Sequence, residues 1–293
     1  MWQEHLLSTR DGKLLYCEAG AGPAVVFLHG GPGDEHRSLR PLAEPLAENF
    51  HCILYDQRGS GGSTLERLNE HNLHPDRFVE DLEDLRRHLG LETLTLVGHS
   101  WGAILALLYG GAHPQQVGRL ALLGMGPLNQ EMAQVARANR LKPLSPQERQ
   151  AYRRLTVERQ AALEAGDAAR MEAVQRERMR LAARSLFYHQ DQVERFLEDW
   201  FKFEPYRNWR VNPLVGRQMD AEKLWAGLLR IQAPALVLYG YQDFEPITQA
   251  YLLREYMPDA RPFFINECGH VPWLEQREAV ESALLAFLKG GAP

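Results

Sequence analysis

The feature that most constrains this chain is a serine flanked by glycines at the junction of two apolar runs. Residues 94–97 are apolar and β-prone, Gly-x-Ser-x-Gly follows at 98–102, and an apolar helical pattern begins at Ala103. A strand that turns into a helix this tightly leaves no room for side chains beside the serine, so glycines are required there. The turn strains the serine backbone and presents its hydroxyl at the carboxyl end of the strand. The pattern therefore predicts a nucleophile at Ser100 rather than a glycine-rich turn with an idle serine.

Length and composition suit a globular protein with a sizeable core. The 293 residues allow one large domain with an insertion, or two domains. A net charge of −5 argues against a nucleic-acid or anionic-membrane partner. No run reaches the roughly 18 apolar residues of a membrane span, and no signal-peptide pattern is visible at the start. The three cysteines, Cys17, Cys52 and Cys268, form no disulfide framework and favour a cytoplasmic location.

The first part of the chain alternates strand and helix signals. Residues 24–28 and 52–55 are continuously apolar, which is typical of parallel strands covered on both faces. An Asp11-Gly12 pair predicts a hairpin near the start. The expected elements are hairpin strands at 4–8 and 13–18, core strands at 24–28, 52–55 and 119–123 besides the strand before Ser100, and helices at 39–48 and 78–89.

The pattern changes between residues 127 and 229, where no convincing strand occurs. This stretch is rich in Ala, Arg, Glu, Gln and Leu, and between residues 137 and 184 it has twelve basic and six acidic residues. We expect amphipathic helices with solvated arginine faces rather than a basic binding patch. Strand signals resume at 235–239 and 261–265, and a last helix is expected over 277–289.

Strands and helices that alternate on both sides of a helical stretch predict an α/β fold. We expect a mostly parallel sheet covered by helices on both faces, with a helical cap inserted after a central strand. The predicted organisation is a core first part at 1–126, the cap at 127–229 and a core second part at 230–293.

A serine hydroxyl needs a general base, and the base needs an orienting acid. Asp243 follows the first of the two late strands, and His270 follows the second. A nucleophile, then an acid, then a histidine, each beyond a strand, is the chain order of an α/β-hydrolase. We therefore predict that Ser100, Asp243 and His270 act together. Glu245 lies two residues after Asp243 and is the alternative acid.

The oxyanion formed by serine attack needs backbone N–H donors. Trp101, the residue after the nucleophile, is expected to supply one. The glycine-rich loop after the first core strand is expected to supply the other from Gly31. His29, at the start of this loop, is expected to hold it by hydrogen bonds rather than act as a second base.

No metal or cofactor is expected. His71 and His74 are three residues apart, but no further ligand cluster accompanies them. No Gly-x-Gly-x-x-Gly pattern follows a strand, which argues against a dinucleotide site.

Together these motifs resemble the prolyl aminopeptidase (proline iminopeptidase) group of α/β-hydrolases. The matching motifs are His29-Gly30-Gly31-Pro32-Gly33, Asp56-Gln57-Arg58-Gly59-Ser60-Gly61-Gly62-Ser63, Ser100-Trp101-Gly102, Asp243 and Gly269-His270. The resemblance implies a cap over the site and removal of an N-terminal residue, often proline, with acidic residues holding the free amine. Glu204 and Glu245 are the candidates for amine recognition. His99 departs from the glycine that this group usually has there.

The sequence thus predicts a serine hydrolase, most simply an aminopeptidase of the proline iminopeptidase type. Its expected substrate is a small peptide, amide or ester. One alternative is a carboxylesterase or carbon–carbon-bond hydrolase on the same fold, which needs no acid near an amine. Another is a non-catalytic small-molecule receptor, which would keep the pocket but not the triad.

Overall fold

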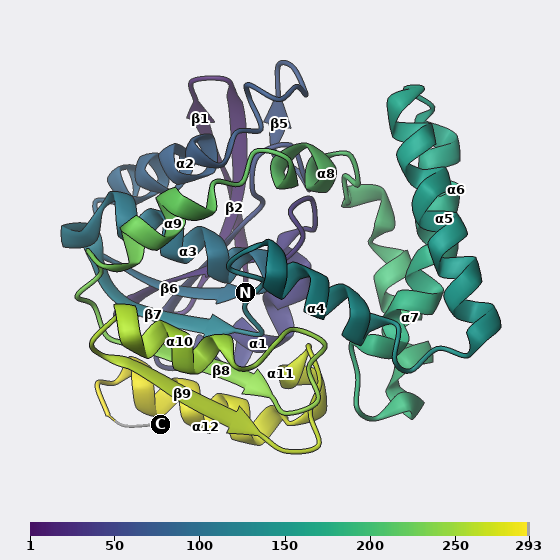
Figure 1. Cartoon of the computed structure of the whole chain (residues 1–293). Coiled ribbons are helices and arrows are strands. Elements are labelled where there is room, and N and C mark those ends of the chain that lie inside the picture. Colours follow the sequence, from purple (N-terminus) through teal and green to yellow (C-terminus); the bar gives the residue numbers. More distant parts are fainter. Residues whose placement is uncertain (292–293) are drawn as a thin grey trace.

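A single sheet runs through the centre of the molecule (Figure 1), in the strand order β1-β2-β4-β3-β6-β7-β8-β9, with β5 paired to β2. The computed structural model describes residues 1–291, apart from the side chain at position 205. The strands are β1 Gln3–Thr9, β2 Gly12–Ala19, β3 Ala24–Leu28, β4 His51–Tyr55, β5 Thr64–Leu65, β6 Leu94–His99, β7 Val117–Leu123, β8 Ala235–Gly240 and β9 Ala260–Ile265.

Helices connect these strands, and six of them, α4 to α9, lie between β7 and β8 in the sequence. They are α1 Arg40–Leu46, α2 Pro75–His88, α3 Trp101–Ala112, α4 Gln130–Arg140, α5 Pro146–Glu164, α6 Ala168–Ala182, α7 Val193–Lys202, α8 Val211–Gly216, α9 Ala221–Leu228, α10 Gln249–Tyr256, α11 Pro272–Glu275 and α12 Arg277–Leu288.

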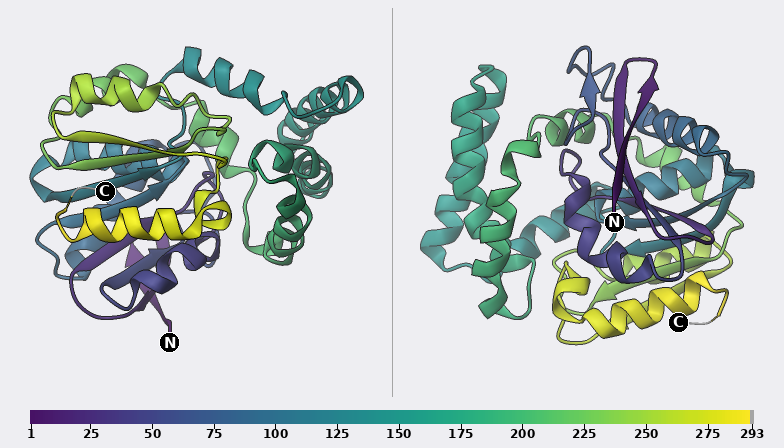
Figure 2. Two further views of the ribbon diagram at one scale, coloured as in Figure 1. Left: turned by 90° about the horizontal axis from the view of Figure 1, so that it is seen from below. Right: turned by 180° about the vertical axis from the view of Figure 1, so that it is seen from behind.

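The sheet is parallel from β4 to β9 and antiparallel only at the β1–β2 side. All six residues of β8 are buried, as expected for a strand covered on both faces, whereas β1 has no buried residue. Figure 2 shows the sheet between two helical layers. The predicted fold class, a mostly parallel sheet with helices on both faces, is confirmed.

Each face of the sheet has its own apolar core. On one face, buried side chains of α2, α3, α9 and α10, such as Leu82 and Leu107, pack against the strands. On the other face, α1 and α12 contribute side chains such as Leu46 and Phe287. The second core continues into the helical insertion through Leu186 and Leu197, so the insertion is packed onto the body of the protein.

The residues between β7 and β8 form helices α4 to α9, without a strand among the described residues. Helices α4 to α7 lie beside the sheet, at the edge where β6 and β8 end (Figures 1 and 2). Helix α9 behaves differently, because it packs on α3, where Gly111 and Gly227 bring the two backbones together. The division into a cap at 127–229 and a two-part core therefore stays a prediction, with α9 packed on the core side.

Local chemistry sets where the elements begin. The helix expected from residue 78 begins three residues earlier, because Pro75 is favourable at a first helical position and the His74 side chain accepts from the Asp76 amide. The helix expected over 39–48 is shorter, at Arg40–Leu46. The first hairpin and the late strands lie where the pattern predicts them, to within one residue at each end.

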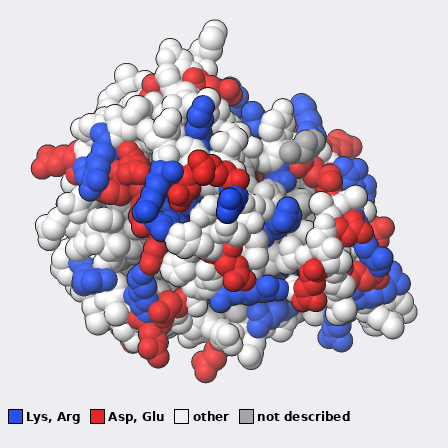
Figure 3. Space-filling model, turned by 90° about the horizontal axis from the view of Figure 1, so that it is seen from above, with Lys and Arg blue, Asp and Glu red and all other residues white. Residues whose placement is uncertain are grey.

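The surface carries charges of both signs. On the face shown in Figure 3, Lys and Arg side chains are interspersed with Asp and Glu, without one continuous basic patch. Within residues 1–291, no helix is both long enough and apolar enough to cross a membrane.

The turn at Ser100 tolerates no side chain at its glycines. A Cβ on Gly102 would lie 2.0 Å from the carbonyl oxygen of Leu28, and one on Gly98 would lie 2.4 Å from the carbonyl oxygen of Gly102. Both obstacles are backbone atoms, which cannot rotate away. The helix that follows the serine is therefore held directly against β3.

Gly102→Ala should lower the free energy of unfolding by about 3 kcal/mol or more, because the added methyl group overlaps fixed backbone. Gly216→Ala is the matched control, since nothing lies within 4 Å of its added Cβ. The control should be neutral or stabilising by up to about 1 kcal/mol. Urea unfolding measures both, and equal stability of the two variants would contradict the packing argument.

Candidate active site

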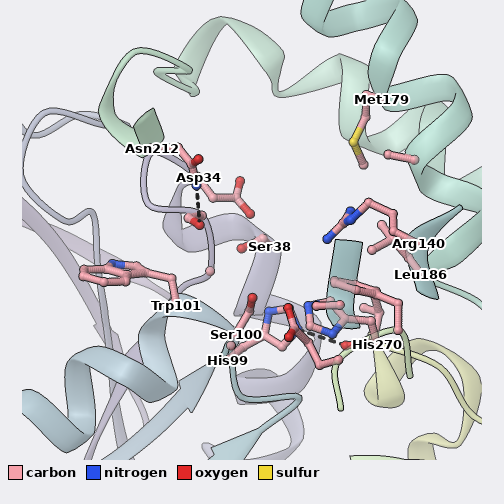
Figure 4. Close-up of a pocket in the computed structure, with 18 of the residues that line it drawn as sticks. Asp34, Ser38, His99, Ser100, Trp101, Arg140, Met179, Leu186, Asn212 and His270 are labelled. Atoms are coloured by element: carbon pink, nitrogen blue, oxygen red, sulfur yellow. Dashed lines mark hydrogen bonds between the residues drawn. The ribbon is translucent and has the colours of Figure 1, made fainter. Parts of the chain in front are cut away.

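Ser100 occupies the sharp turn between β6 and α3. Its φ of 54° and ψ of −115° are strained for a residue with a side chain. Two backbone hydrogen bonds hold it, from its own amide to Leu123 at 2.9 Å and from the Gly126 amide to its carbonyl at 3.2 Å. The side chain lines the large cavity between the core and the helical insertion (Figure 4). The predicted strain and position of the serine are both present.

His270 and Asp243 come together from the loops after β9 and β8. His270 Nδ1 lies 2.9 Å and 3.0 Å from the two carboxylate oxygens of Asp243, and both residues are buried. This pairing puts the proton on Nδ1 and leaves Nε2 available as a base. His270 lies beside Ser100 in Figure 4, although Ser100 Oγ makes no hydrogen bond to it in this structure. Such bonds often tighten only with substrate bound.

Gly124 is a site residue that the sequence reasoning missed. It follows β7 with φ +47°, and a Cβ there would lie 3.1 Å from both Asp243 Oδ2 and His270 Nδ1. A side chain would therefore press on the acid–histidine pair. A glycine after a strand was visible in the sequence, but which groups lie opposite it depends on how β7 and β8 pair.

The glycine-rich loop passes directly over the serine. A Cβ on Gly30 would lie 3.4 Å from Ser100 Cβ, and Gly31 adopts φ +112°, a conformation that favours glycine. Asn212 from the helical insertion donates to the Gly31 carbonyl at 2.8 Å. The loop is thus placed where its backbone can approach a reacting carbonyl group.

Gln57 joins the two backbone segments that were expected to bind the oxyanion. Its side chain donates to the His29 carbonyl at 2.8 Å and accepts from Trp101 Nε1 at 2.8 Å. Its amide donates to His29 Nε2 at 3.0 Å, so His29 Nδ1 carries the proton and donates to Gly30. Burial lowers the pKa of His29, which keeps the ring neutral. His29 is therefore structural, as predicted, and Gln57 is its missed partner.

His99 supports the loop that carries the catalytic-base candidate. Its Nε2 lies 2.9 Å from the His270 carbonyl oxygen, and the two rings lie 4.7 Å apart. Trp273 packs edge-on against the other side of its ring. Burial, reinforced by the nearby His270, lowers the pKa of His99 well below its ordinary value. A neutral His99 thus donates to the His270 backbone and fixes that loop.

Three side chains of metal-ligand type, Glu35, His36 and Asp56, lie within 4.8 Å of one another. One Asp56 oxygen accepts from the His36 amide at 2.7 Å and its ring Nδ1 at 2.9 Å, and the other accepts from Gly62 at 2.7 Å. Asp56 is thus occupied in holding two loops together. Next to it, Arg58 makes a two-point pair with buried Asp81, at 2.8 and 2.6 Å. The motif around Asp56 therefore has a structural role in this fold.

The cavity has a volume of about 1840 Å³ and carries Ser100 and His270 in its wall. Two buried carboxylates also line it, Glu245 and Glu35. Among the described residues, Glu245 Oε2 has no hydrogen-bond partner, whereas Glu35 Oε2 pairs with Arg37 at 3.1 Å and its Oε1 lies 3.6 Å from Arg207. Burial, with the neighbouring Asp243, raises the pKa of Glu245 to about 8. Burial and the charge of Asp34 raise the pKa of Glu35.

The two glutamates expected to recognise an amine are placed differently. Glu245 lines the cavity, but Glu204 does not, because its buried carboxylate turns to Arg176 in an ion pair. Glu35 was missed, although it follows the glycine-rich loop closely. Its neighbour in the cavity wall is Arg207, whose guanidinium is 3.6 Å away and also pairs with Asp34.

Comparisons with known proteins agree with this architecture. The sequence profile of the alpha/beta hydrolase fold matches residues 23–276. A proline iminopeptidase of Arabidopsis thaliana is 42% identical over 123 residues, which is 41% of this chain and 32% of the relative. A probable proline iminopeptidase of Leptolyngbya boryana is 27% identical over 291 residues, which is 92% of this chain and 88% of the relative.

The solved structure of a proline iminopeptidase from Mycobacterium smegmatis has a TM-score of 0.72 at 20% identity, over 98% of both chains, and so shares the fold. The predicted resemblance to the proline iminopeptidase group is confirmed by these relatives. The chain spans only 32% to 40% of the length of the first curated relatives it matches.

Glu245→Gln should change how stability depends on pH. The unfolded chain loses the Glu245 proton near its ordinary pKa of 4.5, whereas the folded protein keeps it up to about pH 8. Between these values the folded state holds the extra proton, so wild-type stability falls with rising pH relative to the variant. The slope is at most about 1.4 kcal/mol per pH unit, the value for one proton.

Below about pH 4.5 and above about pH 8 the difference between the two proteins should be flat, because both states then carry the same charge at this position. Urea unfolding across this range measures it. A constant difference at every pH would contradict a buried, protonated Glu245.

Proposed function

Since the chain belongs to the α/β-hydrolase fold family, we propose that it is a serine hydrolase with Ser100 as the nucleophile. His270 is the general base and Asp243 orients it. The observation that carries this proposal is the strained Ser100 at the turn, beside a buried His270 that is fixed through Nδ1 by Asp243. A serine that is accessible to substrate, a base and an acid that orients the base are the groups that acyl transfer needs.

The reaction follows from this arrangement. His270 Nε2 takes the Ser100 proton as Oγ attacks the substrate carbonyl, and it then gives that proton to the leaving group. The backbone N–H groups of Gly31 and Trp101 bind the oxyanion of the tetrahedral intermediate. Water, activated by the same histidine, then hydrolyses the acyl-enzyme and regenerates the serine.

The proposed activity is release of an N-terminal residue from a small peptide or amide. Glu245 supports it, because its buried Oε2 has no hydrogen-bond partner among the described residues and a substrate ammonium group would satisfy it. Glu35 adds a second carboxylate to the cavity wall, with one oxygen paired to Arg37 and the other 3.6 Å from Arg207. The relatives named proline iminopeptidases point the same way. Because Glu204 is paired outside the cavity, we assign amine recognition to Glu245 and Glu35 instead.

Two other functions would use parts of the same site. A carboxylesterase or carbon–carbon-bond hydrolase would need the triad but no carboxylate for an amine. A non-catalytic receptor would need the cavity but not the paired Asp243 and His270. The buried Glu245, with one oxygen lacking a hydrogen-bond partner among the described residues, favours the aminopeptidase over the esterase, and the pairing of Asp243 with His270 favours it over the receptor.

Ser100→Ala and His270→Ala should each lower kcat for a proline aryl-amide by several orders of magnitude, because the three residues act as a unit. Asp243→Asn should also lower it strongly. Initial rates measure the effect, and circular dichroism checks that each variant folds. Near-normal turnover by Ser100→Ala would rule out the nucleophile, and a larger loss in Glu245→Gln than in Asp243→Asn would make Glu245 the acid.

Glu245→Gln and Glu35→Gln should lower kcat/KM for a proline aryl-amide about tenfold or more. A bound ammonium group lowers the pKa of each carboxyl group and pairs with its charged form, which glutamine cannot supply. A neutral short-chain aryl ester should be affected much less. Glu204→Gln is the matched control, since it is a buried glutamate outside the cavity wall. Equal losses on amide and ester, or ready cleavage of N-acetylated amides by the wild type, would leave the esterase alternative.

A further inference from the structure

Among the arginines of α4 to α6 that line the cavity, three are partly buried rather than exposed to solvent. Arg140, Arg159 and Arg178 come from α4, α5 and α6, and all three are partly buried residues of the cavity wall. The expectation that the arginines of this stretch form solvated faces is wrong for these three. We call them the cap arginines.

The cap arginines lack an acidic partner. Among the residues that the structure describes, no carboxylate oxygen lies within 4.0 Å of any of their guanidinium nitrogens. Arg178 is held only by neutral groups, donating to Tyr152 at 2.6 Å, Thr156 at 3.2 Å and Gln175 at 3.5 Å. Its charge is thus positioned but not neutralised.

The three charges are also close enough to repel one another. Burial, followed by the charges of Arg159 and Arg140, lowers the pKa of Arg178 to about 10. Burial likewise lowers the pKa of Arg159. Gathering like charges in a partly desolvated wall is unfavourable unless an anion joins them.

Other arginines in or next to these helices form ion pairs with acidic side chains. Arg154 on α5 pairs with Glu158, Arg176 on α6 pairs with Glu204, and Arg184 just after α6 pairs with Glu148. Acidic partners are therefore available in this part of the chain, yet the described residues place none within ion-pair distance of the three cap arginines.

Arg140 connects this cluster to the catalytic centre. Its guanidinium carbon lies 3.7 Å from the centre of the Phe244 ring, and that ring lies 4.5 Å from the ring of His270. In Figure 4, Arg140 extends into the space above His270 and Ser100. Glu245 is also near, but its pKa of about 8 keeps it largely protonated at neutral pH, so it leaves Arg140 uncompensated.

We propose that Arg140, Arg159 and Arg178 form a binding site for a carboxylate group of the substrate. The inference rests on the proposed function only in placing that carboxylate on a peptide. Guanidinium groups bind carboxylates through paired hydrogen bonds. Arg140 lies near His270, because both contact the ring of Phe244. Ser100 and the three arginines line the same cavity, so a peptide whose scissile carbonyl lies at Ser100 has its C-terminal part on the side that Arg140 enters (Figure 4).

The first test measures binding alone and uses ligands without an amino group. Isothermal titration of Ser100→Ala with 4-phenylbutyrate and with its amide compares ligands matched in shape but not in charge. We expect the acid to bind at least tenfold more tightly. Adding Arg178→Gln or Arg159→Gln should abolish this preference, whereas Arg178→Lys should keep part of it and Arg154→Gln, on α5 but outside the cavity wall, should keep all of it.

Equal affinity for acid and amide, or equal loss of the preference in Arg154→Gln, would overturn the proposal. Because the titration uses an inactive variant and a ligand without an amine, its result stands even if the aminopeptidase activity is absent.

The second test identifies the source of the carboxylate. Values of kcat/KM are compared for Pro-Gly, Pro-Gly-amide and Pro-Glu-amide. Preference for Pro-Gly over its amide assigns the site to a peptide C-terminus, and preference for Pro-Glu-amide over Pro-Gly-amide assigns it to an acidic side chain. Both support the site, and Arg178→Gln should erase either preference. Equal values for all three peptides would contradict it.

Discussion

The close approach of α3 to β3 at Ser100 is the constraint on which the site depends. The Gly102 backbone lies where a Cβ would overlap the Leu28 carbonyl, so the helix begins directly above the strands. This contact fixes the strained serine and brings the glycine-rich loop over it. Gln57 then links that loop to Trp101 through three hydrogen bonds. The proposed nucleophile and oxyanion donors are therefore one unit, held by backbone packing and by the buried Gln57.

Uncompensated charge distinguishes the cavity from the rest of the protein. Elsewhere, buried charges are paired, as in Arg58 with Asp81 and Arg176 with Glu204. In the cavity, among the residues that the structure describes, Glu245 has an oxygen without a hydrogen-bond partner and no ion pair, and the cap arginines have no carboxylate within ion-pair distance. Acids near the serine and bases on the facing helices match a substrate with an amine at one end and a carboxylate at the other. Such a substrate is what an enzyme acting on short peptides would bind.

Much of the fold was predictable because it depends on local pattern. Continuous apolar runs marked the parallel strands, and the order of Ser100, Asp243 and His270 beyond three strands followed from the chain itself. Element ends were less predictable where single contacts decide them, as at His74 and Pro75. The helical stretch was recognised by its lack of strand signals, but the packing of α9 on the core was not, because the pairing of Gly111 with Gly227 joins distant segments.

The sequence by itself determined the layered fold, the strained turn at Ser100 and the members of the proposed catalytic triad, since period, glycine placement and chain order are properties of neighbouring residues. Only the tertiary structure decided which charges face the cavity. Glu204 and Glu245 are both glutamates near aromatic residues, yet one turns to Arg176 and the other lines the site. Arg154 and Arg159 lie on one helix, yet only the second enters the cavity. Burial and partner choice depend on contacts between segments far apart in the chain, which no local pattern encodes.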